Sequence, residues 1–259
     1  MLRKHLSERR RKEIASLAHK KYREQLGESV VEGVRALDAA VRAKAPLVEI
    51  LVTEQALSEP HVSDLLEKAG VPVYVVPENE MARLSDVQTS QGVLAVVEVK
   101  KVPEEDLLAQ RSVLILDGVQ DPGNVGTIIR TAAWFGADAV VAGMGTADFF
   151  NPKVIRASMG AVWDVLLTRT ENLPALLVRL KSAGFSLYGA DLNGSDVRRW
   201  HPALPSALIL GSEAHGLGAE TRRHVDQSIS ITGRPGHPGT ESLNVATAAA
   251  ILIYQWLGN

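Results

Sequence analysis

The order of apolar and polar residues in the first part of the chain predicts a small α/β domain. Short apolar runs alternate here with stretches whose apolar residues recur at helical spacing. A spacing of about 3.6 residues is typical of an amphipathic helix, and a short apolar run bounded by turn residues is typical of a strand. The expected helices are 30–43, 61–70 and 78–86, and the expected strands are 48–53, 71–76 and 92–99. We therefore assign residues 26–100 to one α/β domain.

From residue 112 onwards, apolar strands and helices alternate strictly. The expected strands are 112–119, 137–143, 164–169, 185–192, 206–213 and 227–232. Helices are expected from Asn124, from Asn151, over 172–184, shortly after residue 213 and over 242–257. Nearly continuous runs of Val, Ile and Leu are typical of parallel strands that are buried on both faces of a sheet. Residues 112–259 are thus predicted to form a mostly parallel α/β domain, and the charged, proline-containing segment 101–111 to be a linker.

The composition excludes several classes of protein. The chain of 259 residues is 46% hydrophobic, so it can bury a substantial core, and it has no cysteine for a disulfide or a cysteine-ligated zinc site. No apolar run approaches the roughly 20 residues that a membrane-spanning helix needs. The N-terminus is charged where a secretory signal would be apolar. We expect a cytoplasmic protein that has no membrane span and binds no metal.

The charge is distributed unevenly, although the formal net charge is only −2. Residues 1–25 contain nine Lys or Arg and three Asp or Glu, so their net charge is +6 and that of the remaining chain is −8. We interpret residues 1–25 as a basic N-terminal arm. The charge alone leaves two interpretations open: contact with the phosphates of a polyanion, or a solvated helix without a ligand.

Candidate chemistry is expected where the strands end, since open α/β sheets bind ligands at the carboxyl ends of their strands. The first such segment runs from Asn124 to Arg130. Asn124 is expected to cap the helix that follows. Arg130 lies among apolar residues of that helix, so we expect a buried guanidinium that needs a partner. This segment alone favours a structural ion pair, and a ligand is the alternative.

Two further segments carry polar residues at the end of a strand or the start of a helix. The run LILGSEAHGLG, residues 208–218, places Gly211 and Glu213 at the end of a strand. A glycine there lets the backbone approach a ligand closely, and Glu213 could pair with Arg130 or bind a ligand hydroxyl. Ser242 and Asn244 follow a loop rich in glycine and proline, at the start of the last helix, where backbone N–H groups lack partners. Each segment by itself also fits an ordinary turn or cap.

Together the three segments resemble the three motifs of one enzyme family. NVGTIIR (124–130), LILGSEAHGLG (208–218) and SLNVATAAAILIY (242–254) are similar to the motifs of the SpoU (TrmH-like) branch of the SPOUT RNA methyltransferases. VVEGVRALDAAV and LSDVQTSQGVLAVVEV resemble the start and end of the family's N-terminal substrate-binding domain, and NPKVIRASMGAVWDV resembles the segment between the first two motifs. The resemblance covers essentially the whole chain. Those enzymes transfer a methyl group from S-adenosylmethionine to a ribose 2′-hydroxyl in RNA.

The resemblance implies an α/β trefoil knot, in which the C-terminal stretch threads through a preceding loop. It also implies a homodimer whose sites lie beside the subunit interface, and it implies no metal. Carried over position by position, S-adenosylmethionine would be held by Gly211, Ile231 and Leu243. The catalytic group would comprise Arg130, Asn124, Glu213, Ser242 and Asn244. This donor has no pyrophosphate, which explains why the glycines do not form the G-x-G-x-x-G pattern of dinucleotide sites.

Arg130 is expected to act on the ribose oxygen that attacks the methyl carbon. The family is generally described with this arginine as the proton acceptor. Electrostatic stabilisation of the developing alkoxide is the alternative, and it suits arginine better because a guanidinium is not deprotonated in proteins. Asn124 and Ser242 would position Arg130 and the nucleotide, while Glu213 and Asn244 would support the motif loops.

RNA is the expected partner, and a full N-terminal domain favours ribosomal RNA. Candidates for phosphate contact are Arg3, Lys4, Arg9, Arg10, Arg11, Lys12, Lys153 and Arg156. Three alternatives stay open: the same reaction on tRNA, an RNA-binding module without catalysis, and a nucleotide-dependent enzyme of the Rossmann type. The absence of G-x-G-x-x-G argues against the last, and the presence of the motif residues argues against the second.

Overall fold

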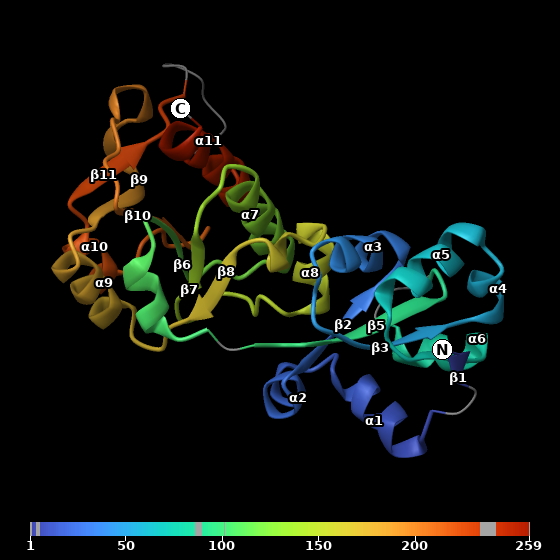
Figure 1. Ribbon diagram of the computed structural model, residues 1–259. Helices are drawn as coiled ribbons and strands as arrows, with labels where there is room; N and C mark the ends of the chain where they lie inside the picture. The colour runs from blue at the N-terminus through green and yellow to red at the C-terminus, as the bar shows by residue number, and fades with distance from the viewer. Residues whose placement is uncertain (1, 4–5, 86–89, 101, 234–241, 259) are drawn as a thin grey trace. The chain divides into compact units, whose positions relative to one another are not determined.

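The computed structural model describes residues 2–3, 6–85, 90–100, 102–233 and 242–258 (Figure 1). The chain divides into two compact units. Unit 1 comprises Met1–Lys100 and Phe150–Asp164, and unit 2 comprises Lys101–Phe149 and Val165–Asn259.

Unit 1 contains a five-stranded mixed sheet in the order β1-β4-β3-β5-β2. Its strands are β1 (Leu2–Arg3), β2 (Glu28–Glu32), β3 (Leu47–Val52), β4 (Val73–Val75) and β5 (Val93–Glu98). Its helices are α1 (Glu8–Ser16), α2 (Lys20–Leu26), α3 (Val34–Arg42), α4 (Glu54–Leu57), α5 (Pro60–Ala69), α6 (Glu78–Leu84), α8 (Pro152–Ser158) and the short 3-10 helix η2 (Ala161–Trp163). Strand β4 pairs in parallel with β1 and β3, while β5 runs antiparallel to β3 and β2. The predicted α/β class of this part of the chain is confirmed.

The predicted helix 30–43 is wrong at its start. Val30 and Val31 belong to β2, where they pair with Val96 and Ala95 of β5. The helix α3 begins only after Gly33, whose φ of +93° suits glycine. The two valines suit the apolar face of a helix, but β-branched residues also pack well in a sheet, and pairing with a distant strand decides between the two.

Residues 1–25 are part of unit 1 rather than a separate arm. Leu6, Ile14 and Leu17 are buried in the same apolar cluster as residues of β2, β3, β5 and α6. Arg23 is also buried, and its Nη1 donates hydrogen bonds to the carbonyl oxygens of Leu17 at 2.7 Å and Ala18 at 2.9 Å. The basic composition of this segment therefore hides apolar residues that anchor α1, while Arg23 is the buried residue of α2.

Arg10, from α1, is held by carboxylates of three other residues. Its Nη1 and Nη2 donate to the two carboxylate oxygens of Glu28 at 2.8 and 3.0 Å. Its Nε donates to Glu49 at 2.5 Å, and Nη1 also contacts Glu13 at 3.3 Å. Burial alone would lower the pKa of Arg10, but the hydrogen bonds to Glu28 and Glu49 outweigh burial and raise that pKa. The guanidinium thus serves the fold of unit 1.

Replacing Arg10 with methionine is expected to destabilise unit 1 by about 2 kcal/mol, since it leaves the nearly buried Glu49 carboxylate without its cation. Arg9→Met is the matched control, because the neighbouring Arg9 side chain is 89% exposed and, among the described residues, forms an ion pair only with Glu13, four residues away. Exposed pairs of this kind contribute little. Urea denaturation followed by circular dichroism measures both variants, and equal effects would contradict a structural role for Arg10.

Residues 150–164 pack within unit 1, although the sequence boundaries placed them in the second domain. The hydroxyl of Ser29 in β2 donates a hydrogen bond of 2.6 Å to the carbonyl oxygen of Phe150. A Cβ added to Gly160 would lie 2.4 Å from the Cβ of Ala39 in α3, so the chain passes α3 at a distance that only glycine permits. A distant helix and strand thus determine where this segment belongs.

Unit 2 contains a six-stranded sheet in which every neighbouring pair is parallel. Its strands are β6 (Ser112–Asp117), β7 (Ala139–Ala142), β8 (Leu166–Arg169), β9 (Ser186–Asp196), β10 (Ser206–Gly211) and β11 (Gln227–Ser230). Its helices are α7 (Pro122–Trp134), α9 (Leu173–Ser182), α10 (Ala219–His224), α11 (Val245–Leu257) and the short 3-10 helices η1 (Glu104–Ala109) and η3 (Val197–Arg199). Helices α7 and α11 cover one face of the sheet, and α9 and α10 cover the other (Figure 1). The predicted parallel sheet is confirmed.

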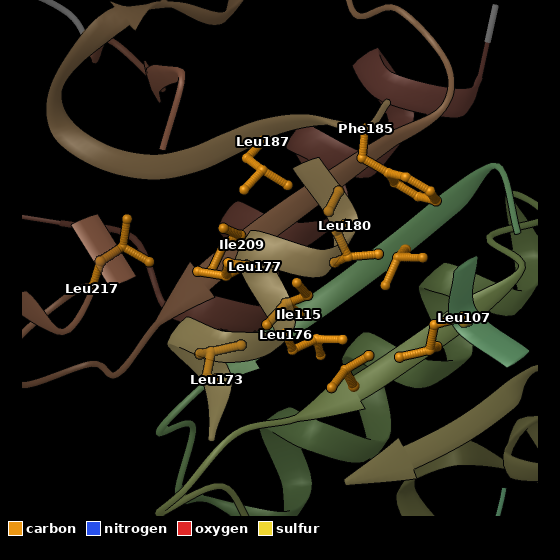
Figure 2. Close-up of a cluster of buried hydrophobic side chains, with 14 residues drawn as sticks. Leu107, Ile115, Leu173, Leu176, Leu177, Leu180, Phe185, Leu187, Ile209 and Leu217 are labelled. Carbon is orange, nitrogen blue, oxygen red and sulfur yellow. The ribbon is translucent and has the colours of Figure 1, made fainter. Parts of the chain in front are cut away.

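The core of unit 2 shows why its strands read as continuous apolar runs. Val113 and Ile115 face the cluster drawn in Figure 2, whereas Leu114 and Leu116 point to the opposite face and are equally buried. Leucines of α9 at helical spacing pack on the first face: Leu173, Leu176, Leu177 and Leu180. Both faces of the sheet are therefore covered.

The predicted linker 101–111 contributes to this core. It contains η1, and its Leu107 is fully buried in the cluster of Figure 2. The hydroxyl of Thr168 in β8 donates a hydrogen bond of 2.6 Å to the carbonyl oxygen of Val102. Glu104 forms an ion pair with Arg179 of α9. The segment is therefore charged because Glu105, Asp106 and Arg111 are exposed, although Leu107 packs on unit 2.

The strand order of unit 2 is β11-β9-β10-β6-β7-β8. A Rossmann sheet, counted along the chain, has the order 3-2-1-4-5-6. Here the fourth and fifth strands are exchanged, so that β10 rather than β9 lies beside β6. As a result Gly211 at the end of β10 is in register with Asp117 at the end of β6. The exchange brings the loops after these two strands together.

The predicted knot depends on the segment before α11. Residues 234–241 lie outside the described residues, and the threading stays a prediction. Among the residues that the structure describes, no helix combines the length and apolarity that a membrane span requires. Within the same residues, no three His, Asp or Glu side chains converge in a way that would hold a metal ion.

Candidate active site

The first motif begins helix α7, and its cap differs from the one predicted. Asp121, not Asn124, is the N-cap: its carboxylate accepts a hydrogen bond of 2.8 Å from the backbone N–H of Asn124. Pro122 occupies the first turn, where its missing N–H costs nothing. Asn124 therefore lies inside the first turn, and its side chain is free for another role.

A chain of hydrogen bonds joins the three motifs through the side chain of Asn124. Its Nδ2 donates to Oε1 of Glu213 at 2.7 Å, and its Oδ1 accepts from Nδ2 of Asn244 at 3.1 Å. The bonded pairs are 89 and 120 residues apart in the sequence. The structure thus brings together one residue from each predicted motif.

Asn244 also organises the start of the third motif's helix. It is the N-cap of α11, and its Oδ1 accepts from the backbone N–H groups of Ala246 at 2.9 Å and Thr247 at 3.3 Å. With its oxygen used for the cap, its Nδ2 is oriented toward Asn124. Ser242 lies two residues earlier and is exposed. The cap therefore couples the position of α11 to the first motif.

The loop of the second motif folds back on itself after β10. Ser212 and Gly216 exchange backbone hydrogen bonds of 3.0 and 2.9 Å. A Cβ on Gly211 would lie 2.1 Å from the carbonyl carbon of Gly216, so only glycine fits there. Asp117, at the end of β6, accepts a hydrogen bond of 2.9 Å from the N–H of Gly218. The loop is thereby fixed at both of its ends.

A cavity of about 870 Å³ lies beside this loop, at the carboxyl ends of β9, β10 and β11. Its lining includes all three predicted cofactor residues and three of the predicted catalytic ones: Gly211, Ile231, Leu243, Glu213, Ser242 and Asn244. Asn124 and Arg130 are not among the lining residues. The volume falls within the roughly 300–1,000 Å³ of small-molecule sites.

The lining suits the chemistry of S-adenosylmethionine. Leu210, Ile229 and Leu252 supply apolar surface for a purine, and the ends of the strands supply backbone N–H and C=O groups. The carboxylate of Glu213 also lines the cavity, which suits a ligand that carries a sulfonium and an ammonium group. The residues present therefore fit this cofactor.

The environment of Arg130 differs from the predicted one. We expected a buried guanidinium, but the residue is exposed on α7, whereas Ile128, Ile129 and Ala132 are buried. Arg130 has no hydrogen bond or ion pair with any residue that the structure describes, and Glu213 is bonded to Asn124 instead. The structural ion pair considered for Arg130 is therefore not formed with Glu213. Its donors stay available to a ligand.

The candidates for phosphate contact fall into different environments, all in unit 1. Arg9, Lys12 and Lys153 are exposed. Arg10 and Arg11 form ion pairs with carboxylates, Arg11 at 2.8 Å from Glu80. Arg156 is half-buried, and its Nη1 is buried without a hydrogen-bond partner among the described residues. The structure gives only the backbone of Arg3, and Lys4 lies outside the described residues.

Four residues around the site were missed in the sequence. Asp121 and Asp117 hold the first and second motif loops, and Asp191 and Arg222 line the cavity. Pro122 signalled the earlier start of α7 and hence the cap at Asp121. Asp117 directly follows the apolar run of β6, which is also a readable signal. Asp191 and Arg222 give no local signal, because they meet only through the packing of β9 and α10.

Comparison with known proteins agrees with these observations. The model of the SpoU rRNA Methylase family matches residues 111–254, and that of the MRM3-like substrate binding domain matches residues 9–95. The 23S rRNA (guanosine(2553)-2′-O)-methyltransferase RlmP of Bacillus subtilis is 37% identical over 248 residues, which are 95% of each chain.

Solved structures resemble the whole chain. A putative RNA methyltransferase of the TrmH family from Porphyromonas gingivalis has a TM-score of 0.80 and 34% identity, covering 97% of this chain and 98% of its own. The SpoU methyltransferase AviRb from Streptomyces viridochromogenes, in complex with AdoMet, has a TM-score of 0.84 and 25% identity, covering 96% and 97%. Two family models, a relative of nearly the same length and the convergence of the three motifs lead to one conclusion: the chain belongs to the SpoU rRNA methylase family.

Proposed function

We propose that this protein transfers a methyl group from S-adenosylmethionine to a ribose 2′-hydroxyl of ribosomal RNA in the cytoplasm. The observation that carries the proposal is the hydrogen-bonded chain from Glu213 through Asn124 to Asn244, beside a cavity that fits the cofactor. The name of the relative RlmP gives 2′-O-methylation of 23S rRNA for that protein, and the AviRb structure contains AdoMet.

The cofactor would be held by Gly211, Ile231 and Leu243 at the ends of the strands. When bound, it supplies a methyl carbon that is activated by a positively charged sulfur. The loop at Gly211 is closely packed, so the backbone groups that face the ligand are fixed before it binds. Such preorganisation lowers the cost of orienting the reacting groups.

Arg130 would stabilise the negative charge that develops on the ribose oxygen while the hydroxyl proton passes to solvent water. The side chain is exposed and keeps its donors free, so it can approach a negatively charged or partly charged oxygen of the RNA. A guanidinium presents several N–H donors and keeps its charge, which suits electrostatic stabilisation. Asn124 would position the first motif around it, and Ser242, exposed at the mouth of the cavity, would contact the incoming nucleotide.

Unit 1 would bind the RNA outside the cavity. Arg9, Lys12 and Lys153 are exposed and suited to phosphate contact, whereas Arg10 would first have to leave Glu28 and Glu49. The match of residues 9–95 to a substrate binding domain supports this role. RlmP, which is a 23S rRNA methyltransferase by name, aligns with 95% of this chain and so with most of this domain. This similarity favours ribosomal RNA over tRNA.

The active form would be a homodimer that is formed through α7 and α11. Trp134 at the end of α7 is 84% exposed, and Tyr254 and Ile251 of α11 are 55% and 37% exposed. Phe135 packs edge-to-face on Tyr254, which joins the two helices into one surface. Large apolar side chains that are exposed together are typical of an interface, and an isologous contact buries the same surface on both copies.

The proposed reaction is tested by mapping 2′-O-methylation on two substrates. We expect purified protein and S-adenosylmethionine to protect one linkage of unmodified large-subunit ribosomal RNA from alkaline cleavage, since a methylated 2′-oxygen cannot attack its own phosphate. Unmodified tRNA in a parallel reaction should show no protected linkage. If only the tRNA is protected, tRNA is the substrate and the proposal of ribosomal RNA is wrong. If neither RNA is protected, the protein is an RNA-binding module without catalysis.

A further inference from the structure

The cavity contains an ion pair that the proposed chemistry does not use. Arg222, from α10, places its Nη1 2.5 Å from Oδ2 of Asp191, which follows the apolar part of β9. Both residues line the cavity that holds the three predicted cofactor residues. The Asp191 side chain is only 9% exposed, whereas that of Arg222 is 51% exposed. The carboxylate is thus the fixed partner, and the guanidinium extends from it into open space.

The pair leaves most of the guanidinium free. Asp191 uses Oδ2 for Arg222 and Oδ1 to accept the backbone N–H of Asn193 at 3.0 Å, so its turn is held in place. An arginine has five N–H donors, and a contact through Nη1 leaves Nη2 and Nε for a second acceptor. A carboxylate is the acceptor that matches this planar fork best.

Arg222 is also the single arginine or lysine among the described residues that line the cavity. S-adenosylmethionine has one anionic group, the α-carboxylate of its methionine part. The other charged side chains of the described lining are the carboxylates of Asp191 and Glu213, which would repel that group. We infer that Arg222 binds the α-carboxylate of the cofactor and that Asp191 is the positioning residue that orients Arg222. This inference rests on the proposed function.

Two ligands separate this role from a structural one. S-adenosylhomocysteine keeps the amino-acid part of the cofactor, and 5′-methylthioadenosine has the same adenosine and sulfur without it. We expect Arg222→Gln to weaken S-adenosylhomocysteine about 10- to 100-fold, as for the loss of a charged hydrogen bond. The affinity for 5′-methylthioadenosine should stay within about twofold. Calorimetry on the full chain measures both.

The neighbouring Arg223 provides the matched control. Its side chain is 73% exposed and pairs with Glu220 on the surface of the same helix. Arg223→Gln should bind both ligands as the unmodified protein does. Arg222→Lys, which keeps a positive charge near Asp191, should lose less affinity than Arg222→Gln. Asp191→Asn, which can still accept the N–H of Asn193, should weaken S-adenosylhomocysteine several-fold and leave 5′-methylthioadenosine unchanged.

The outcomes distinguish the inference from the function on which it rests. If Arg222→Gln weakens both ligands equally, or neither, the contact with the α-carboxylate is refuted while the proposed reaction stands. If the unmodified protein binds neither S-adenosylhomocysteine nor S-adenosylmethionine, the proposed function fails and the inference fails with it. Equal melting temperatures of the two arginine variants would show that a selective loss of affinity is not caused by unfolding.

Discussion

Arg130→Ala is expected to reduce methyl transfer at least about 100-fold while leaving the affinity for S-adenosylhomocysteine unchanged. The size follows from the loss of a preorganised donor to a developing oxyanion. The binding should persist because Arg130 is not among the residues that line the cavity. Single-turnover kinetics and calorimetry check the two halves of this expectation. Turnover close to that of the unmodified protein would remove Arg130 from the reaction.

A second variant separates the two chemical roles considered for Arg130. Arg130→Lys introduces an amine with an ordinary pKa near 10.4. If the residue stabilises negative charge, activity of this variant should fall as the pH approaches 10, because the lysine loses its charge. If the residue accepts a proton, activity should rise over the same range, because the neutral amine is the base. The direction of the pH–rate profile therefore decides between these roles.

Asn124→Ala is expected to lower the rate of methyl transfer about 10- to 100-fold, because it removes both side-chain bonds between the first motif and the other two. Thr127→Ala is the matched control: Thr127 is exposed on the same helix, and the substitution keeps the backbone carbonyl that accepts the hydroxyl of Thr131. Single-turnover rates compare the two variants. Equal rates would contradict a coupling role for Asn124.

A double-mutant cycle tests whether Asn124 and Glu213 act together. Glu213→Gln keeps the shape of the side chain and removes its charge, so the hydrogen bond from Asn124 is weakened. Because the two side chains are in contact, the combined loss should be clearly smaller than the product of the separate losses. Losses that simply multiply would show that the two residues contribute independently.

Much of the fold could be predicted from local patterns. The strands of unit 2 were recognisable because both of their faces are buried, which leaves an uninterrupted apolar run in the sequence. The start of α7 was misplaced, although Asp121 followed by Pro122 is a readable signal for an N-cap. The prediction that Arg130 is buried was also wrong. On α7, Arg130 lies on the same exposed face as Thr127 and Trp134, whereas Ile128 and Ile129 lie on the buried face.

Other features had no local signal. Nine basic residues indicated an arm in residues 1–25, but two of the three carboxylates that hold Arg10 lie 18 and 39 residues further along the chain. Val30 and Val31 suit either a helix or a strand, and their pairing with β5 decides for the strand. In each case the deciding contact is with a residue far away in the sequence.

The sequence by itself determined the two α/β segments, the family motifs and the residues that we propose for the chemistry, because these depend on periodicity and on the identity of side chains. The tertiary structure alone decided that β10 lies beside β6, that Asn124 joins Glu213 to Asn244, and that Asp191 meets Arg222 in the cavity. The physical reason is that strand order and these contacts follow from how buried surfaces pack, and the same local patterns are compatible with several packings.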